Sequence, residues 1–380
     1  MREALAEKKK LNRKFLRSGT THREFPVSGP LERADRRVGS AVRTATARKP
    51  APTLKPELRP KKDNAKIPPM KIAFVFPGQG SQTVGMGHPL AAQCPIARAV
   101  FQQADETLAF PLSTLCFEGP EEQLKLTQNT QPALLAVSIA ALRVLNHLNV
   151  QPHVVAGHSL GEYSALVAAG ALDFPDALRL VRKRGAYMQE AVPAGVGAMA
   201  ALLRMPEDRL PAVLAQAAQG EIVSAANLNS PDQIVIAGHK GAVERAIELA
   251  KAAGARRAVL LPVSAPFHCA LMRPAQHRMR AELDAAVFQP LRVPLVNNWQ
   301  AREVLTAGDA REGLYHQIPN PVLWIDTVRH LAASGVTLAI EVGAGAVLSG
   351  LIRQIDPSIK TASFGGPDPA ADWEKLRAFL

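Results

Sequence analysis

VVAGHSLG, residues 154–161, joins a short apolar run to a serine that lies between two glycines. The run is typical of a buried strand, and residues 162–170 follow it as a helix-forming segment. A Gly-x-Ser-x-Gly sequence between a strand and a helix is typical of a nucleophile elbow, in which the glycines let the backbone turn sharply and expose the serine hydroxyl. Ser159 is therefore the candidate nucleophile. We expect the amide of Leu160 to be one of the unpaired N–H groups at the start of the helix.

Strands and helices alternate on both sides of this serine, which predicts a hydrolase-like α/β core with a parallel sheet. A first apolar strand at 72–76 ends in the turn PGQG. We expect Gly78 and Gly80 to free the backbone so that the amide of Gln79 becomes a second oxyanion donor. A phosphate-binding loop is the competing interpretation, but this turn lacks the lysine and the spacing of a P-loop.

Residues 195–264 have a different order of elements and predict a ferredoxin-like βαββαβ subdomain inserted into the core. The catalytic domain would then comprise residues 70–194 and 265–380. The predicted elements of the insertion are a strand at 198–203, a helix at 207–218, strands at 222–226 and 233–237, a helix at 242–253 and a strand at 258–263.

His268 is the candidate base for the serine. It follows the predicted strand at 258–263 and a turn, and it precedes a helical run from Cys269 whose positive end would keep the imidazole neutral. Glu341 lies on a later predicted strand, and no Asp or Glu has an obvious third position. The sequence therefore favours a Ser–His dyad over a triad.

Arg184 lies on the apolar face of a helix predicted at 175–191, whereas Arg179, Arg182 and Lys183 fall on other faces, where we expect them to be solvated. A buried arginine needs a partner, and its planar guanidinium suits a carboxylate bound through two hydrogen bonds. That carboxylate belongs either to the protein or to a substrate. Spacing alone leaves both readings open.

Charge is distributed unevenly along the 380 residues. Of the 45 Lys and Arg and the 33 Asp and Glu, residues 1–70 hold 19 and 7, so the remainder holds 26 of each and is formally neutral. The first 69 residues are basic, rich in proline and without a sustained apolar period, which predicts a disordered tail. The tail is either an extension upstream of a start at Met70 or a basic interaction segment. Its acidic residues and early lysine run argue against an organelle-targeting peptide.

Three scattered cysteines exclude a disulfide framework and have no metal-ligand spacing. The longest apolar stretch, 132–142, is shorter than a membrane span, and residues 1–70 lack the apolar block that is typical of a secretory signal. We expect a cytoplasmic protein that binds neither a metal nor a membrane.

Several blocks of this chain resemble the signature blocks of the malonyl-CoA:acyl carrier protein transacylases. Together they are far more specific than Gly-x-Ser-x-Gly alone, and they occur in order over residues 71–355. The blocks are FVFPGQGSQ at 74–82, GHSLGEY at 157–163, RG at 184–185, PFH at 266–268 and EVG at 341–343.

The resemblance implies a Ser–His acyltransferase with Ser159 as nucleophile and His268 as base, and with the amides of Gln79 and Leu160 as oxyanion hole. It further implies malonyl-CoA as substrate, an acyl carrier protein as partner, no cofactor and a role in fatty-acid biosynthesis. We expect a monomer that does not bind nucleic acid.

Four further positions refine the resemblance. Arg184 matches the arginine that holds the malonyl carboxylate, and Gln317 matches the position whose backbone carbonyl orients the histidine. Phe267 resembles malonyl-selective members, since its bulk would crowd an α-methyl branch, a discrimination of about 1 to 3 kcal/mol per methyl group. Ala344 replaces the usual proline of the EVGPG turn, away from the proposed chemistry.

Three alternatives remain. A serine thioesterase or esterase would use the same elbow with water as acceptor. A malonyl transferase of a polyketide or malonate decarboxylase system would share every motif. A binding protein acting through the basic tail is the third.

Overall fold

The computed structural model describes residues 70–263 and 265–380, so the predicted tail at 1–69 lies outside the described residues, as does the last residue of the predicted insertion. Its larger sheet has six strands in the order β10-β9-β1-β2-β7-β8. All neighbouring pairs are parallel except β7 and β8, which are antiparallel. The strands are β1 (Ile72–Phe76), β2 (Val154–Gly157), β7 (Leu295–Val296), β8 (Glu303–Val304), β9 (Leu338–Val342) and β10 (Lys360–Phe364).

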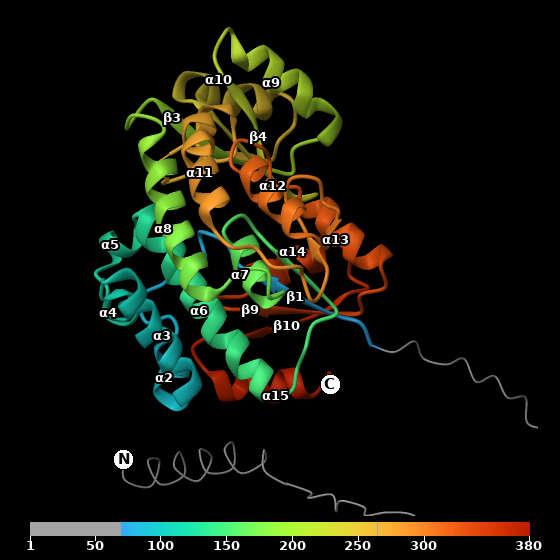
Figure 1. Cartoon of the computed structure of the whole chain (residues 1–380). Helices are drawn as coiled ribbons and strands as arrows, with labels where there is room; N and C mark the ends of the chain where they lie inside the picture. The colour runs from blue at the N-terminus through green and yellow to red at the C-terminus, as the bar shows by residue number, and fades with distance from the viewer. Residues whose placement is uncertain (1–69, 264) are drawn as a thin grey trace, which may run out of the picture. The chain divides into compact units, whose positions relative to one another are not determined.

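Both faces of this sheet are covered, as its continuous apolar strands predict. Phe74 and Phe76 of β1 pack on one face in a core that includes α3 (Pro95–Leu108), α6 (Thr127–His147) and α8 (Phe174–Glu190). Val75 points to the opposite face, where α13 (Trp324–Ala333) and α14 (Val347–Ile355) complete a second core. The alternation along β1 therefore separates two helical layers (Figure 1).

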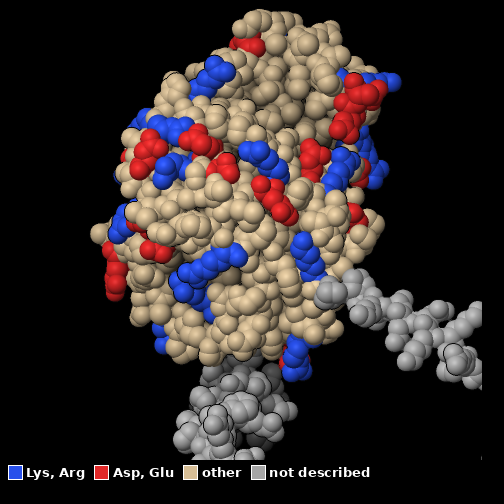
Figure 2. Space-filling model, turned by 45° about the vertical axis from the view of Figure 1, so that its right-hand side comes forward, with Lys and Arg blue, Asp and Glu red and all other residues tan. Residues whose placement is uncertain are grey.

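The remaining helices of this part surround the sheet. They are α2 (His88–Gln93), α4 (Leu112–Glu118), α5 (Glu121–Lys125), α7 (Gly161–Ala168), α11 (Arg273–Ala285), α12 (Ala307–Gln317) and α15 (Pro369–Arg377). No helix among the described residues is long and apolar enough to cross a membrane. On the face shown in Figure 2, basic and acidic side chains are interspersed, as expected from the balanced charge of residues 71–380.

A second sheet of four antiparallel strands has the order β4-β5-β3-β6 and its own apolar core. Together with its two helices it follows the ferredoxin-like order βαββαβ, and it lies at the top of Figure 1. Its elements are β3 (Gly197–Leu203), α9 (Leu210–Ala218), β4 (Val223–Ser230), β5 (Gln233–His239), α10 (Lys240–Ala252) and β6 (Arg257–Leu260). The domain boundaries that we place at 194/195 and 264/265 remain a prediction.

Several predicted boundaries in this subdomain differ from the structure, and the strand predicted at 222–226, for example, runs on to Ser230. The helix predicted from residue 207 begins with a 3₁₀ turn, Glu207–Arg209, because Pro211 stands in the first turn of α9. The strand predicted at 258–263 ends at Leu260, since Pro262 cannot donate a ladder hydrogen bond. Residues 261–263 and 265–267, between β6 and His268, belong to no helix or strand.

Candidate active site

Ser159 lies in the turn between β2 and α7 with a φ of 51°, in the left-handed region that a residue with a side chain seldom adopts. The two glycines around it serve close approach rather than an unusual φ. A Cβ on Gly157 would collide with the backbone of Gly161, and a Cβ on Gly161 would collide with the carbonyl oxygen of Phe76. The glycines therefore allow the sharp turn, as the motif predicts, while the serine adopts the left-handed φ.

Asn298 holds this turn from a distant part of the chain. Its Oδ1 accepts from the Ser159 amide at 2.6 Å, and its Nδ2 donates to the carbonyl oxygen of Gly157 at 2.5 Å. The backbone N–H of Asn298 donates to Oε2 of the buried Glu162 at 2.9 Å. The sequence analysis did not identify Asn298. Its only signal in the sequence is its position two residues after the short apolar strand β7, at the carboxyl end of the sheet, where loops carry site residues.

Ser159 and His268 are in contact, as the motif predicts, with 2.7 Å between Oγ and Nε2. The Nδ1 of His268 donates to the backbone oxygen of Gln317 at 3.1 Å. Because a proton on Nδ1 leaves Nε2 with a free lone pair, this bond selects the tautomer that can accept the serine proton. Glu341 takes no part, since its carboxylate accepts from the amides of Leu348 and Ser349 at the start of α14.

The pKa of His268 is lowered to about 3, first by burial of the ring and second by the charge of Arg184. This corrects the cause predicted from sequence. A short 3₁₀ turn, Ala270–Met272, follows the histidine, and α11 begins only at Arg273. The imidazole is thus neutral at physiological pH because it is buried next to a guanidinium, not because a helix begins beside it.

We expect the reaction of Ser159 with a fluorophosphonate to retain its rate as the pH falls from 7 to 5. A base with the ordinary histidine pKa of 6.5 would lose about 25-fold over that range, whereas a group with a pKa of about 3 stays neutral. Glu162, whose pKa burial raises to about 7, titrates in the same interval, so the second-order rate constant is to be measured in Glu162→Gln as well. A midpoint near pH 6.5 in both proteins would contradict the assignment.

Arg184 is 1% exposed on the apolar face of α8, as predicted. Its Nη1 donates to Oε1 of Gln131 at 2.8 Å, and its Nη2 donates to Oε1 of Gln317 at 2.8 Å and to Oγ of Ser159 at 3.1 Å. Among the described residues no carboxylate forms an ion pair with it, and its Nε has no hydrogen-bond partner. The guanidinium is thus buried next to the serine. The neutral side-chain amides of Gln131 and Gln317 orient it but do not neutralise its charge.

Gln317 does more than the backbone contact expected from the resemblance. Besides receiving the Arg184 hydrogen bond, its side chain donates through Nε2 to the backbone carbonyl oxygen of Ser159 and to Oε2 of Glu162, both at 2.9 Å. Burial raises the pKa of Glu162 to about 7, although hydrogen bonds and the charge of Arg184 oppose the rise. Glu162 and Gln317 therefore join the serine, the histidine and the arginine in one buried network.

The proposed oxyanion donors are placed at the end of β1 and at the start of α7. Leu160 precedes the first residue of α7, and Gln79 follows β1 by three residues. Within residues 70–263 and 265–380, the backbone N–H of neither Gln79 nor Leu160 donates to a protein acceptor, whereas the neighbouring backbone N–H of Gly161 donates to the His158 carbonyl oxygen at 2.9 Å. Both N–H groups are thus available to a bound oxygen atom.

Phe267 and Arg182 are both shielded from solvent to some extent. Phe267 is buried directly before the histidine. Arg182, predicted to be solvated, is half-buried, since it lies over the Phe110 ring at 4.5 Å and donates to Oδ1 of Asn129 at 2.8 Å. In the described part of the chain, no group of three or more His, Cys, Asp or Glu side chains could hold a metal ion.

The family model "Acyl transferase domain" matches residues 73–363 of this chain. A malonyl CoA-acyl carrier protein transacylase of Bacillus subtilis is 50% identical over 299 residues, covering 78% of this chain and 94% of the relative. Two solved structures are also similar. An acyl carrier protein S-malonyltransferase of Vibrio cholerae has 46% identity, a TM-score of 0.78, and coverage of 80% of this chain and 99% of its own. A malonyl-transacylase bound to a type II polyketide synthase acyl carrier protein has 44% identity, a TM-score of 0.79, and coverage of 82% and 100%.

Proposed function

Since the chain belongs to the acyl transferase family, we propose that it transfers a malonyl group from malonyl-CoA to the phosphopantetheine thiol of an acyl carrier protein. The group travels as an ester on Ser159. Fatty-acid synthesis is the pathway that the relatives' names favour, and the polyketide complex among the similar structures keeps a polyketide carrier as the second candidate.

The observation that carries the proposal is the charge of Arg184, which is buried 3.1 Å from the serine hydroxyl and has no ion-pair partner in the described residues. Burying a lone guanidinium is costly unless a ligand compensates it. An acyl group that ends in a carboxylate supplies that compensation. Among the described residues no carboxylate lies within ion-pair distance of Arg184, and the buried Glu162 acts on it only as a nearby charge, which favours a substrate carboxylate over a structural salt bridge.

In the first half-reaction His268 accepts the proton of Ser159 as Oγ attacks the malonyl thioester. The amides of Gln79 and Leu160 donate to the oxyanion, and Arg184 binds the carboxylate. The C–S bond then breaks, His268 returns the proton to the leaving thiolate, and coenzyme A departs. Malonyl-Ser159 remains.

In the second half-reaction the pantetheine thiol of the carrier protein gives its proton to His268 and attacks the ester. The new C–S bond forms and the ester C–O bond breaks. The leaving Oγ of Ser159 then recovers a proton from His268. Arg184 holds the same carboxylate in both steps, so the acyl group need not be rebound. A thioesterase or esterase would differ only in using water, instead of the pantetheine thiol, as the acceptor of the acyl group at this step.

Other predicted properties belong to the same proposal. The bulk of Phe267 next to the base disfavours a methylmalonyl group. The chemistry of the two half-reactions requires only Ser159, His268, Arg184 and the two amides, so we propose that no cofactor takes part. We also propose a cytoplasmic monomer, in which the three buried free cysteines remain reduced.

The test is the mass of the intact protein after brief mixing with malonyl-CoA, and separately with acetyl-CoA. We expect an adduct of malonyl mass that disappears when a holo acyl carrier protein is added, with the carrier gaining the same mass. Fast release of free coenzyme A without an adduct or carrier would instead indicate a hydrolase. Carriers of fatty-acid and polyketide synthesis, tested in parallel, distinguish the two pathways by kcat/KM.

A further inference from the structure

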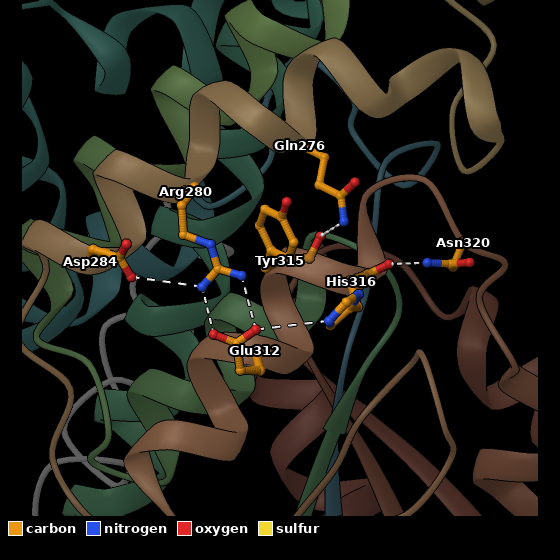
Figure 3. Close-up of polar contacts among 7 residues, drawn as sticks. All are labelled: Gln276, Arg280, Asp284, Glu312, Tyr315, His316 and Asn320. Carbon is orange, nitrogen blue, oxygen red and sulfur yellow. Dashed lines mark hydrogen bonds and ion pairs between the residues drawn. The ribbon is translucent and has the colours of Figure 1, made fainter.

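The last turn of α12 carries backbone oxygens that a helix cannot pair internally. Here three successive carbonyl oxygens each accept from a different side chain. Gln276 Nε2 donates to the oxygen of Tyr315 at 3.2 Å, Asn320 Nδ2 donates to that of His316 at 2.7 Å, and His268 Nδ1 donates to that of Gln317 at 3.1 Å. Figure 3 shows Gln276 and Asn320 approaching this turn from different sides. The histidine of the site is thus one of three side chains that cap one helix end.

The two residues of the His268–Gln317 contact lie next to the start of α11 and at the end of α12. α11 follows His268 after one 3₁₀ turn, and Gln317 is the last residue of α12. Further along the same pair of helices, Arg280 donates to Glu312 through Nη1 and Nη2, at 2.5 and 2.9 Å, and lies over the ring of Tyr315 at 3.7 Å (Figure 3). The Gln276 and Arg280 contacts therefore join α11 to α12, and the contact between His268 and the Gln317 oxygen lies just before α11 begins.

These contacts differ in expected strength because they differ in burial. Gln276 is 8% exposed, so little solvent competes for its hydrogen bond to the Tyr315 oxygen, and an acceptor that loses such a donor is left poorly satisfied. The side chains of Arg280 and Glu312 are 34% and 48% exposed, and solvent screens ion pairs that are exposed to this extent. The Gln276 hydrogen bond is therefore the stronger restraint on the end of α12.

His268 itself needs external restraint. Its φ of 59° is in the left-handed region, where a residue with a side chain stays only if its surroundings hold it. A small displacement of the Gln317 oxygen would let Nδ1 lose its acceptor, and the proton could then move to the nitrogen that faces the serine. The orientation and the tautomer of the ring both depend on where α12 ends.

We propose that Gln276 and Asn320 are positioning residues for His268. By holding the carbonyl oxygens of Tyr315 and His316, they fix the adjacent oxygen of Gln317, which keeps the imidazole proton on Nδ1 and the lone pair of Nε2 directed at Ser159. This inference rests on the role proposed for His268 as base. Neither residue touches the substrate in this scheme.

The test uses the full chain with Gln276→Leu, which keeps the size of the side chain and removes the donor. Asn320→Ala, at a half-buried position, is the second variant in case the first folds poorly. The readouts are the second-order rate constant of Ser159 with a fluorophosphonate and the ¹⁵N NMR signals of the His268 ring, assigned with a His268→Gln variant. Thermal unfolding is followed in parallel.

We expect each variant to slow the reaction of Ser159 about tenfold, by analogy with the loss of hydrogen-bond partners that orient histidines at metal sites. The His268 signals should change from one tautomer to a mixture of two. Arg280→Ala should have a smaller effect, about twofold, because its ion pair is exposed.

Arg278→Ala is the matched control. Arg278 also lies on α11. It pairs with Glu190 at 2.6 Å and lies over the Tyr187 ring at 3.7 Å, and both of these residues belong to α8 rather than α12. Its reaction rate and His268 signals should match the wild type. Variants at 276 and 320 that unfold at a lower temperature yet keep the wild-type rate and tautomer would overturn the proposal. A wild type that reacts with fluorophosphonate but not with malonyl-CoA would overturn the proposed function instead.

Discussion

Ser159→Ala is expected to lower malonyl transfer by at least ~10⁴-fold, the scale of loss on removing a nucleophile. No malonyl adduct should form on the protein, because the oxygen that would carry the ester is gone. Alanine tolerates the backbone of this turn about as well as serine does, and only the contacts of Oγ with His268 and Arg184 are lost. The folded structure should therefore persist, and the loss should lie in kcat.

Ser164→Ala provides the matched control for this variant. Ser164 is also a buried serine, on α7 directly behind the elbow, and its Oγ has no hydrogen-bond partner among the described residues. Removing that hydroxyl should leave transfer and adduct formation at the wild-type level. Transfer retained in Ser159→Ala, or lost equally in both variants, would contradict the covalent mechanism.

Arg184→Ala is expected to change substrate preference rather than to abolish chemistry. Malonyl transfer should fall about 10²- to 10³-fold, since removing one partner of a buried, hydrogen-bonded charge pair costs about 2–5 kcal/mol. Transfer of an acetyl group, which has no carboxylate to bind, should be unchanged or faster. The ratio of the two kcat/KM values is the quantity to measure, because it does not depend on the amount of active protein.

Removing a buried side chain of this size also leaves a cavity and two unpaired glutamine oxygens, so Arg184→Met should be measured beside the alanine variant. Arg182→Ala is the control on the same helix, since Arg182 is half-buried and hydrogen-bonded but lies outside the network around Ser159. An equal fall of malonyl and acetyl transfer in both Arg184 variants would show that this arginine is structural.

Much of the candidate site was predicted from short segments, because its chemistry depends on local backbone geometry. The strand and helix around Ser159, the apolar face that contains Arg184 and the glycine turn after β1 each involve neighbours in sequence. The identification of Gln317 came instead from the resemblance, and no local pattern would have selected it. Its backbone contact with His268 has the expected geometry.

The errors have a common physical origin. Arg182 was predicted to be solvated because helical periodicity describes one helix, whereas its burial depends on Phe110 and Asn129 from other elements. The low pKa of His268 was attributed to the nearest helix, but burial and Arg184 cause it, and both depend on the packing of distant segments.

The sequence by itself determined the α/β order, the elbow, the dyad and an arginine on a buried face, since these follow from periodicity and from motifs a few residues long. Only the tertiary structure decided what each buried group contacts. Asn298 holds Ser159 across 139 residues of chain, Glu162 joins the site through Gln317, and Arg184 has no carboxylate within ion-pair distance among the described residues. Such pairings are set by how the sheets and helices pack, because hydrogen bonds and unpaired charges depend on distances in space, which local sequence patterns do not encode.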